Sequence, residues 1–542
     1  MPALNAHKYR PIAPVALTNR QWPSRQLTQA PTWCSVDLRD GNQALPEPMT
    51  VEQKKQLWQL LVKLGFKEIE VGFPAASQPD FDFVRWLIEA QQIPEDVTIQ
   101  VLVQAREPLI ARTYEALADV KQAIVHVYNS TSPTQRDWVF GMDKAQVKAL
   151  AVQGAQLLQR YAQNYPQTEW RFQYSPESFT QTEPDYALEV CNAVLDVWQP
   201  TTKKPAIINL PSTVQVATPN VFADQVEYIS SQLNYRDAVV LCVHTHNDRG
   251  CAVAEAELAM LAGAQRVEGT LLGNGERTGN CDITTLAMNL YSQGVDPELD
   301  LSNPDEVIQV VKSCTHIELH PRHPWLGELV YTAFSGSHQD AIGKCLRMQP
   351  LDEPWQVAYL PIDPKDIGRS YEAVVRVNSQ SGKGGTAFVL ERDYGIRLPK
   401  WLQPAVAKHV QHLSESQASE VRSEQIYQLF EQHFLSPVTG WIMTAYTLDS
   451  QDHQDVLSFT LDDGRVFRGQ GAGAIEALIN ALDMNMSVVD YQEHALTQGT
   501  QSQAIAYFKL EIEQKSVFGV AISDDSVWAS LQAVLTACAN AT

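Results

Sequence analysis

The chain has 542 residues, of which 44% are hydrophobic and 19% are charged, and its formal net charge at pH 7 is −22. The composition is that of an ordinary globular protein, and the length predicts two or three domains. The negative charge argues against nucleic acids and anionic membranes as partners, because both carry the same sign. No stretch approaches the roughly 18 apolar residues that a membrane-spanning helix needs.

The cysteines and the N-terminal segment indicate a cytoplasmic protein. The eight cysteines are scattered without a CxxC pair, which is typical of reduced core residues. Residues 1–32 contain Lys8, Arg10, Arg20 and Arg25, as a targeting peptide would. Three prolines and the lack of an amphipathic pattern favour an extended N-terminal arm instead.

Short apolar runs then alternate with segments of helical spacing. Eight runs are expected to be strands: Trp33–Leu38, Glu68–Gly72, Thr98–Val103, Ala123–Val127, Trp170–Tyr174, Ala206–Leu210, Val239–His244 and Arg266–Leu271. Near-continuous apolar strands are typical of a parallel sheet buried on both faces, and eight β–α units occupy about 250 residues in a TIM barrel. The pattern therefore predicts an α/β protein with a catalytic (β/α)8 barrel over residues 33–330. An open, doubly wound parallel sheet is the alternative.

The alternation stops after Ser292. A Pro-rich region leads to Ser379–Gly385, whose glycines and serines predict a flexible connection, and then to helical patterns that end near Phe434. Residues 331–435 are therefore expected to form a helical linker region.

Residues 436–542 contain two similar halves, each with three strands and a helix. The expected strands are Trp441–Leu448, Val456–Leu461, Arg465–Arg468, Met486–Ala495, Ala504–Gln514 and Val517–Ile522, and the expected helices are Ala474–Leu482 and Ser526–Ala539. This βββα duplication predicts a small α+β unit. Because it carries no cluster of titratable groups, it suits a dimerised effector domain better than a catalytic one.

Two histidines end the seventh predicted strand. His244 and His246 are two residues apart, so their side chains point to the same face of a strand. Imidazole is a common metal ligand, and the pair predicts a metal site. A pair of polar side chains satisfied at a strand end is the alternative.

Arg39 and Asp40 follow the first predicted strand, on the face where a barrel forms its active site. Asp40 adds a carboxylate to the two imidazoles, which suits a divalent ion with open coordination positions. Arg39 is a fixed cation beside that ion, suited to a ketone oxygen that becomes an alkoxide. A surface Arg–Asp pair in a turn is the alternative.

Three further strand ends carry polar groups. Glu276 and Asn280 lie in the glycine-rich segment after the eighth strand, where Asn280 is placed to reach the metal. Glu276 is placed to orient Arg39 or a cofactor. Glu177 follows the fifth strand and suits proton transfer, and Thr213 follows the sixth and suits a substrate carboxylate. A structural role is the alternative for each of them taken singly.

At these residues the sequence resembles the DRE-TIM metallolyases and, within that group, the long-form 2-isopropylmalate synthases. The motifs that carry the resemblance are DLRDGNQ (Asp37–Gln43), YSPESFT (Tyr174–Thr180), NLPSTV (Asn209–Val214), HTHNDRG (His244–Gly250), GNGERTGN (Gly273–Asn280), YTAFSGSHQDAI (Tyr331–Ile342) and GRSYEAVVRVNSQSGKGG (Gly368–Gly385). They extend over essentially the whole chain. The resemblance implies condensation of acetyl-CoA with 3-methyl-2-oxobutanoate, the first committed step of leucine synthesis.

The resemblance also implies a role for each candidate residue. Asp40, His244 and His246 would bind the divalent metal, with Asn280 in or near its coordination shell. Arg39 would polarise the ketone and stabilise the alkoxide. The oxo acid would chelate the metal through its carboxylate and ketone, and the enolised acetyl-CoA would attack that ketone.

The remaining candidates concern substrate binding and proton transfer. Thr213 would hold the carboxylate of the oxo acid, and Glu276 would contribute to substrate binding. Glu177, His338 and Tyr371 would serve deprotonation of the acetyl methyl group or hydrolysis of the thioester. His338 and Tyr371 lie outside the barrel segment, so they are expected to be lent across a dimer interface.

The implied cofactors and partners follow from the same resemblance. The metal would be Mg²⁺ or Mn²⁺, with Zn²⁺ as an alternative, and acetyl-CoA is the co-substrate, with K⁺ as a further activator. The protein would form a homodimer, residues 331–435 would complete the active site, and residues 436–542 would bind leucine as a feedback inhibitor.

Three rivals share some of these features. Citramalate or homocitrate synthase has the same metal site and a different pocket for the oxo-acid side chain. A metal-dependent aldolase or lyase uses the same barrel in reverse, but has less use for an effector domain. A leucine sensor built on an inactive barrel is disfavoured, because the proposed metal ligands and Arg39 are all present.

Overall fold

The computed structural model describes residues 6–333, 335–369, 383–417, 421–436, 438–451, 454–496 and 502–541. The chain divides into two compact units, Met1–Val330 and Tyr331–Thr542. No helix in these described ranges is long and apolar enough to cross a membrane.

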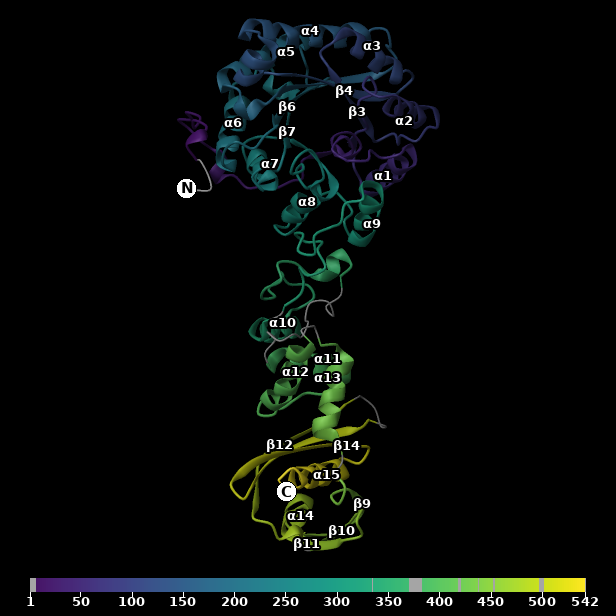
Figure 1. Ribbon diagram of the computed structural model, residues 1–542, viewed down its shortest axis with the longest axis vertical. Helices are drawn as coiled ribbons and strands as arrows, with labels where there is room; N and C mark the ends of the chain where they lie inside the picture. The colour runs from purple at the N-terminus through teal and green to yellow at the C-terminus, as the bar shows by residue number, and fades with distance from the viewer. Residues whose placement is uncertain are drawn as a thin grey trace. The chain divides into compact units, whose positions relative to one another are not determined.

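The first unit is a closed barrel of eight parallel strands that pair in sequence order (Figure 1). They are β1 (Thr32–Ser35), β2 (Glu68–Glu70), β3 (Thr98–Gln104), β4 (Gln122–Ser130), β5 (Glu169–Glu177), β6 (Ala206–Ser212), β7 (Val239–Thr245) and β8 (Arg266–Gly269). β8 closes the barrel by pairing with β1. The predicted TIM barrel is confirmed, and the alternative of an open sheet is wrong.

Helices surround the barrel on its outside (Figure 1). They are α1 (Val51–Leu64), α2 (Gln78–Glu89), α3 (Glu107–Ala116), α4 (Lys144–Ala162), α5 (Pro184–Trp198), α6 (Pro219–Gln232), α7 (Ala252–Leu261), α8 (Ile283–Tyr291) and α9 (Pro304–Thr315). All of them except α7 begin where the sequence supplies a side-chain cap or a proline. Thr50, for example, forms a capping box with Gln53, and Gly65 ends α1 with a φ of 103°.

The barrel interior is more polar than the apolar strands predict. In β2, Ile69 alternates with Glu68 and Glu70, and in β8, Val267 separates two further charged residues, so period-2 alternation puts the charges on one face. All of these side chains are buried. These two strands are therefore buried on both faces, as expected, but they carry charged side chains, which lie inside the barrel.

The N-terminal arm contacts α6. The guanidinium of Arg20 donates two hydrogen bonds of 2.6 Å to the carboxylate of Asp224, and the indole of Trp22 donates a third of 2.8 Å. The backbone N–H groups of Gln21 and Trp22 donate to Glu227. Two acidic side chains of α6 thus fix this part of the arm. Its only regular structure in the described residues is a pair of short turns, η1 (Ala6–Lys8) and η2 (Trp22–Ser24).

The second unit begins with helices. They are α10 (Gly336–Met348), α11 (Lys383–Tyr394), α12 (Gln403–Gln417) and α13 (Ser423–Phe430), with the shorter turns η8 (Pro364–Ile367) and η10 (Glu431–Leu435). The predicted flexible connection Ser379–Gly385 is wrong at its end, because Lys383 begins α11. Its remainder, 379–382, lies outside the described residues.

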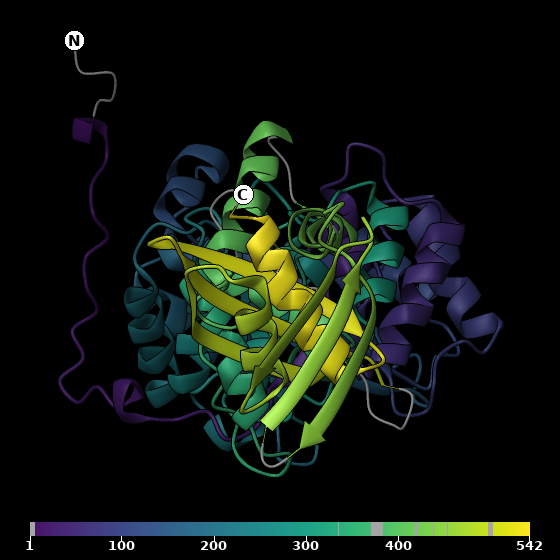
Figure 2. The same ribbon diagram turned by 90° about the horizontal axis from the view of Figure 1, so that it is seen from below.

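The predicted duplication is confirmed in the second unit. The first half is β9 (Met443–Gln451), β10 (Gln454–Leu461), β11 (Val466–Gly471) and α14 (Ala474–Leu482), and the second is β12 (Met486–Ala495), β13 (Ala504–Ile512), β14 (Lys515–Ser523) and α15 (Ser526–Ala539). Each half forms an antiparallel three-stranded sheet. Figure 2 shows α15, the long yellow helix, lying against these strands.

One glycine in each half shows the repeat at atomic detail. A Cβ on Gly469 would lie 2.1 Å from the carbonyl oxygen of Ala477 in α14. A Cβ on Gly519 would lie 1.9 Å from the carbonyl oxygen of Ala533 in α15. The third strand of each half therefore passes so close to its helix that only glycine fits.

Candidate active site and metal centre

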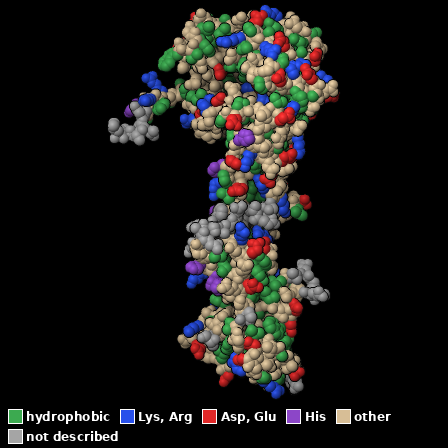
Figure 3. Space-filling view, turned by 45° about the vertical axis from the view of Figure 1, so that its right-hand side comes forward, with side chains coloured by type: hydrophobic (Ala, Val, Ile, Leu, Met, Phe, Trp, Pro, Cys, Tyr) green, Lys and Arg blue, Asp and Glu red, His purple; other side chains and the backbone are tan. Residues whose placement is uncertain are grey.

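The candidate residues of the barrel surround one cleft of about 270 Å³. It lies at the carboxyl ends of the strands, where barrel enzymes place their chemistry. Its lining includes Arg39, Asp40, Glu177, Thr213, His244, His246 and Glu276. The face of the molecule in Figure 3 mixes acidic and basic side chains, so an anionic ligand must rely on local cations such as those of the cleft.

Three side chains of the cleft converge as metal ligands would. Ligand atoms of Asp40, His244 and His246 all lie within 4.8 Å of one another, and all three residues are buried. Nε2 of His244 is 3.4 Å and Nε2 of His246 is 3.8 Å from Oδ2 of Asp40. The strand end of β7 thus presents both imidazoles to the same carboxylate oxygen.

Local structure explains how Asp40 and Asn280 reach this point. Asp40 lies in a short π-helical turn, η3 (Asp37–Gly41), and Asp37 anchors that turn by accepting the N–H of Leu271 at 3.1 Å. Asn280 pairs with His246 as an isolated bridge and donates from Nδ2 to Oδ2 of Asp40 at 2.8 Å. The loop before it is tight, since a Cβ on Gly279, whose φ is 101°, would lie 2.0 Å from a backbone oxygen.

The residues present fit a divalent cation. One carboxylate and two imidazoles form a nitrogen and oxygen set that suits Mg²⁺, Mn²⁺ or Zn²⁺. Two buried polar atoms, Oδ1 of Asn280 and Nδ1 of His246, have no hydrogen-bond partner among the described residues. Buried polar atoms are seldom left unpaired in proteins, and Oδ1 of Asn280 belongs to the amide that contacts Asp40, so it marks a place for a ligand beside that carboxylate.

The electrostatics of the three residues are tightly coupled. Burial opposes ionisation of Asp40, but Arg39 and the imidazoles outweigh it and hold the pKa of Asp40 far below its usual value. Burial lowers the pKa of His244, while Asp40 and Glu268 raise it, with a net result of about 9. Burial and the neighbouring His244 lower the pKa of His246 to about 4. The site therefore holds an ionised carboxylate and one neutral imidazole at pH 7.

Arg39 is held by two carboxylates. Its Nε contacts Glu70, and its Nη1 donates to Asp40 at 2.7 Å. Glu70 is fully buried, and the Arg39 side chain is 11% exposed. The carboxylate that holds Arg39 in place thus comes from β2, and a role for Glu276 toward Arg39, a cofactor or the substrate stays a prediction.

Glu177 and Thr213 are each held by one hydrogen bond. The hydroxyl of Ser130 donates to Oε2 of Glu177. The backbone N–H of Ser178 donates to Oγ1 of Thr213 at 2.9 Å, so the Thr213 hydroxyl hydrogen remains available to an acceptor in the cleft. Both side chains line the cleft.

Several buried polar residues at and behind the cleft were not predicted from the sequence. His126 and Glu70 form a 3.0 Å contact, and a second buried carboxylate, Glu268, contacts His244 at 2.9 Å. Between them lie the buried side chains of Gln100 and Arg266. The signal was present, since the charged residues of β2 and β8 alternate with apolar ones, but hydrophobic runs alone do not show which side chains enter a barrel.

Two predicted residues lie outside the barrel unit. His338 is on α10, and its ring stacks on Tyr359 with centroids 3.9 Å apart. Tyr371 lies outside the described residues. Their part in catalysis stays a prediction.

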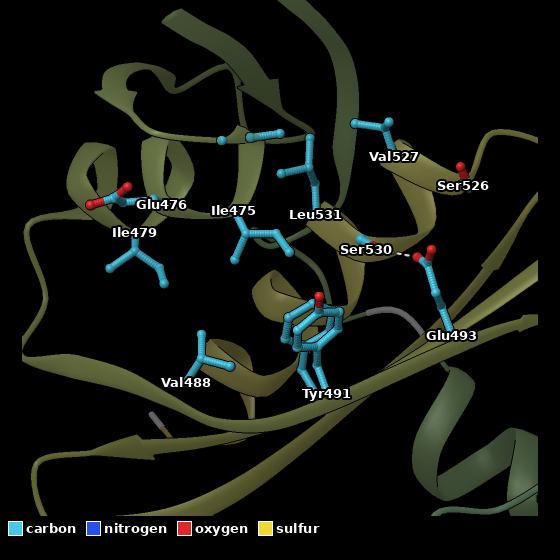
Figure 4. A pocket seen from close by; sticks show the side chains of 13 residues that line it. Ile475, Glu476, Ile479, Val488, Tyr491, Glu493, Ser526, Val527, Ser530 and Leu531 are labelled. Carbon is cyan, nitrogen blue, oxygen red and sulfur yellow. Dashed lines mark hydrogen bonds between the residues drawn. The ribbon is translucent and has the colours of Figure 1, made fainter. Parts of the chain in front are cut away.

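The second unit has a pocket of its own, of about 520 Å³ (Figure 4). Its walls come from α14, α15 and the second sheet, and they include Ile475, Ile479, Val488, Tyr491 and Leu531. Two carboxylates also line it: Glu476 accepts the N–H of Ala472, and Glu493 accepts the hydroxyl hydrogen of Ser530 at 3.0 Å. It is therefore an apolar pocket with two acidic groups at its edge.

Curated relatives of this chain are named 2-isopropylmalate synthase and align with almost all of it. The Alcanivorax borkumensis protein is 52% identical, over 98% of this chain and 96% of its own length. The Rhodospirillum rubrum protein is 53% identical, over 98% of each chain, and the Pseudomonas fluorescens protein is 51% identical, over 98% and 96%. The chain belongs to the 2-isopropylmalate synthase family.

Three family models match successive parts of the chain. The HMGL-like model matches residues 30–311, and the model of the alpha-isopropylmalate synthase post-catalytic domain matches residues 328–391. The model of the LeuA allosteric (dimerisation) domain matches residues 420–542. The resemblance drawn from the motifs is confirmed. The protein is an enzyme of the HMGL-like type with a candidate metal site, and its dimerisation domain indicates an oligomer.

Proposed function

We propose that this protein condenses acetyl-CoA with 3-methyl-2-oxobutanoate and water to give (2S)-2-isopropylmalate and CoA. The observation that carries the proposal is the convergence of Asp40, His244, His246 and Arg39 in one cleft of the barrel. The name that the relatives share supports the choice of the oxo acid over those of citramalate and homocitrate synthase. The reaction class is therefore acyl transfer by a Claisen-type condensation.

The reaction first requires a cation that binds and polarises the oxo acid, and the residues of the candidate metal site support this requirement. A divalent ion, Mg²⁺ or Mn²⁺ in our proposal, bound by Asp40, His244 and His246 with Asn280 beside them, would supply a Lewis acid for the carboxylate and ketone oxygens of the oxo acid. Arg39 is a preorganised cation in a buried setting, where a charge acts more strongly than in water. Its guanidinium would stabilise the negative charge that develops on the ketone oxygen.

Two further side chains would bind substrate and move protons. Thr213 would donate its free hydroxyl hydrogen to the oxo-acid carboxylate. Glu177 would accept a proton from the acetyl methyl group, and the carbanion so formed attacks the ketone carbon to make the new C–C bond. Water then adds to the thioester carbonyl, the C–S bond breaks, and the CoA sulfur leaves as the thiol. His338 and Tyr371, lent by residues 331–435 across a dimer, would share the proton transfers of the last step.

The choice of oxo acid can be tested directly. The values of kcat/KM for pyruvate, 3-methyl-2-oxobutanoate and 2-oxoglutarate would be compared by release of free thiol from acetyl-CoA. We expect 3-methyl-2-oxobutanoate to rank first. A preference for pyruvate would change the product to citramalate and leave the chemistry intact, whereas thiol release with none of the three would contradict the proposal.

We propose in addition that the pocket of the second unit binds leucine as a feedback inhibitor. The apolar side chains in the middle of Figure 4, such as Ile475 and Leu531, suit a branched aliphatic side chain. The first turn of α14 lines the pocket and has no side-chain cap at Gly473, so its N–H groups suit an α-carboxylate. Glu493, at the other side of the pocket, suits the α-ammonium group.

A further inference from the structure

Glu268 contacts a proposed metal ligand from behind. It lies on β8, is 0% exposed, and does not line the cleft. Its Oε2 is 2.9 Å from Nδ1 of His244 and accepts a hydrogen bond of 3.2 Å from Nδ2 of Asn209. Nδ1 is the ring nitrogen of His244 that points away from Asp40. In the neutral ring, a hydrogen on Nδ1 leaves a lone pair on Nε2, which faces Asp40, and the contact with Glu268 therefore determines whether Nε2 can bind a metal.

The other oxygen of Glu268 is surrounded by donors. Its Oε1 accepts from Nη1 of Arg266 at 2.8 Å, from Nε2 of Gln173 at 2.7 Å and from Nε2 of Gln100 at 2.9 Å. With four donors and Nδ1 of His244 around its two oxygens, Glu268 is saturated as an acceptor. Such a carboxylate stays ionised despite its burial, because the guanidinium of Arg266 places a fixed positive charge 2.8 Å from Oε1.

Arg266 determines which atoms of Gln173 and Gln100 face Glu268. A guanidinium can only donate, and it donates to Oε1 of Gln173 at 3.0 Å and to Oε1 of Gln100 at 2.8 Å. Both amides must therefore turn their NH₂ groups toward Glu268. Because the ionised carboxylate can only accept, Nδ1 of His244 must carry a hydrogen, and when the ring gives up its second hydrogen to bind a cation, Nε2 presents its lone pair on the side of Asp40.

We propose that Glu268, fixed by Arg266, is a positioning residue that imposes the tautomer of His244 needed to bind the metal. The inference rests on the metal site of the proposed function. Carboxylates that accept the second N–H of a ligating histidine orient its ring and raise its basicity, and their loss weakens metal binding by about 10-fold to 100-fold. The same network also positions Arg39, because Gln100 donates to Glu70 at 2.5 Å and Glu70 contacts Arg39.

The substitution Glu268→Gln removes the acceptor-only character at almost constant volume. The amide of the new glutamine can adopt two orientations. If its NH₂ group faces His244, it donates to Nδ1, and the ring hydrogen moves to Nε2, where it blocks the metal. If it faces Arg266, it opposes the donors of Arg266, Gln173 and Gln100. Either arrangement is expected to weaken metal binding.

The test is a titration of metal-free protein with Mn²⁺, which needs no substrate. Glu268→Gln is expected to raise the Kd by about 10-fold to 100-fold. Glu268→Asp, which keeps an acceptor-only group, should recover much of that loss. The matched control is Glu68→Gln. Glu68 is also buried and pairs with Arg266, at 2.5 Å, but it contacts Arg171 rather than His244, so this variant should bind Mn²⁺ like the original chain.

Two outcomes would overturn the inference: an unchanged Kd for Glu268→Gln, or an equal loss for Glu268→Gln and Glu68→Gln. If Glu268→Gln does not fold, ¹⁵N spectra of the histidines in the Mg²⁺-loaded original protein decide, with His244→Gln to assign the signal. A hydrogen on Nδ1 supports the inference, and a hydrogen on Nε2 contradicts it. Absence of thiol release by the original chain would refute the proposed reaction and would leave the Mn²⁺ comparison interpretable.

Discussion

The cleft of the barrel and the pocket of the second unit differ in the kinds of side chain that line them. The cleft is the smaller, about 270 Å³ against about 520 Å³, and its lining includes two arginines, three carboxylates and three histidines. Behind it, buried side chains such as Arg266, Gln100 and Glu268 hold one another by hydrogen bonds. The pocket of the second unit is mainly apolar, and its polar groups lie at its edge.

This difference shows what each function demands. A reaction that develops charge on an oxygen needs charges that are already in place, and these persist in a buried site only when partners hold them. Recognition of a small amino acid needs an apolar volume of the right shape and a few polar groups. We therefore expect substitutions in the cleft to act on kcat and metal content, and substitutions in the pocket to act on inhibition alone.

The largest expected effect follows from removal of a metal ligand. His246→Ala removes one of the two imidazoles that converge on Asp40. Loss of several kcal/mol of Lewis-acid stabilisation lowers kcat by about 10³-fold or more. Activity and metal content per chain would be measured together. A variant that is free of metal and fully active would refute the assignment of the site.

A smaller effect is expected at Arg39. In Arg39→Lys, the ammonium group cannot contact Glu70 and Asp40 in the same planar geometry, so kcat should fall by about 10²-fold to 10³-fold. The matched control is Arg171→Lys, since Arg171 pairs with Glu68 away from the cleft. The two kcat values are measured at saturating oxo acid. Equal losses in both variants would mean that Arg39 serves only the fold.

In the pocket, Glu493→Ala tests whether inhibition can be separated from catalysis. Loss of a charged partner for the α-ammonium group should raise the leucine concentration for half-inhibition by about 10-fold, with kcat unchanged. Glu511→Ala, at an exposed position of β13, is the control. The comparison fails if Glu493→Ala lowers kcat as much as it weakens inhibition.

The smallest effect concerns stability and pH. Glu255 on α7 is 2% exposed, its Oε2 has no partner among the described residues, and burial raises its pKa from 4.5 to about 7, against weaker opposition from Gln215 and Ser212. A folded pKa above the unfolded one favours the neutral form, so the fold loses stability as the pH rises from 4.5 to about 7.

Glu255→Gln should therefore stabilise the protein above about pH 7, by about 3 kcal/mol from the pKa difference, and should make little difference near pH 4.5. The melting temperatures of both proteins would be compared at several pH values. A difference that does not change with pH would show that the carboxylate of Glu255 is not the cause.

Sequence patterns predicted the barrel strands and the duplicated unit because both depend on hydrophobic periodicity, which is local. They also predicted His244, His246 and Asp40, because polar groups at strand ends meet on one face of a barrel. They did not predict the side chains behind the cleft. The partner of His244 is Glu268, 24 residues away on the next strand, and only the register of β7 and β8 brings the two together. The contact of Arg39 with Glu70 on β2 was missed for the same reason.

The most direct test of the central claim is release of free thiol from acetyl-CoA in the presence of 3-methyl-2-oxobutanoate, measured in EDTA and again after addition of Mg²⁺ or Mn²⁺. We predict that EDTA abolishes thiol release and that either ion restores it. Thiol release that continues in EDTA from protein shown to be free of metal would contradict the claim that Asp40, His244 and His246 act through a bound divalent ion.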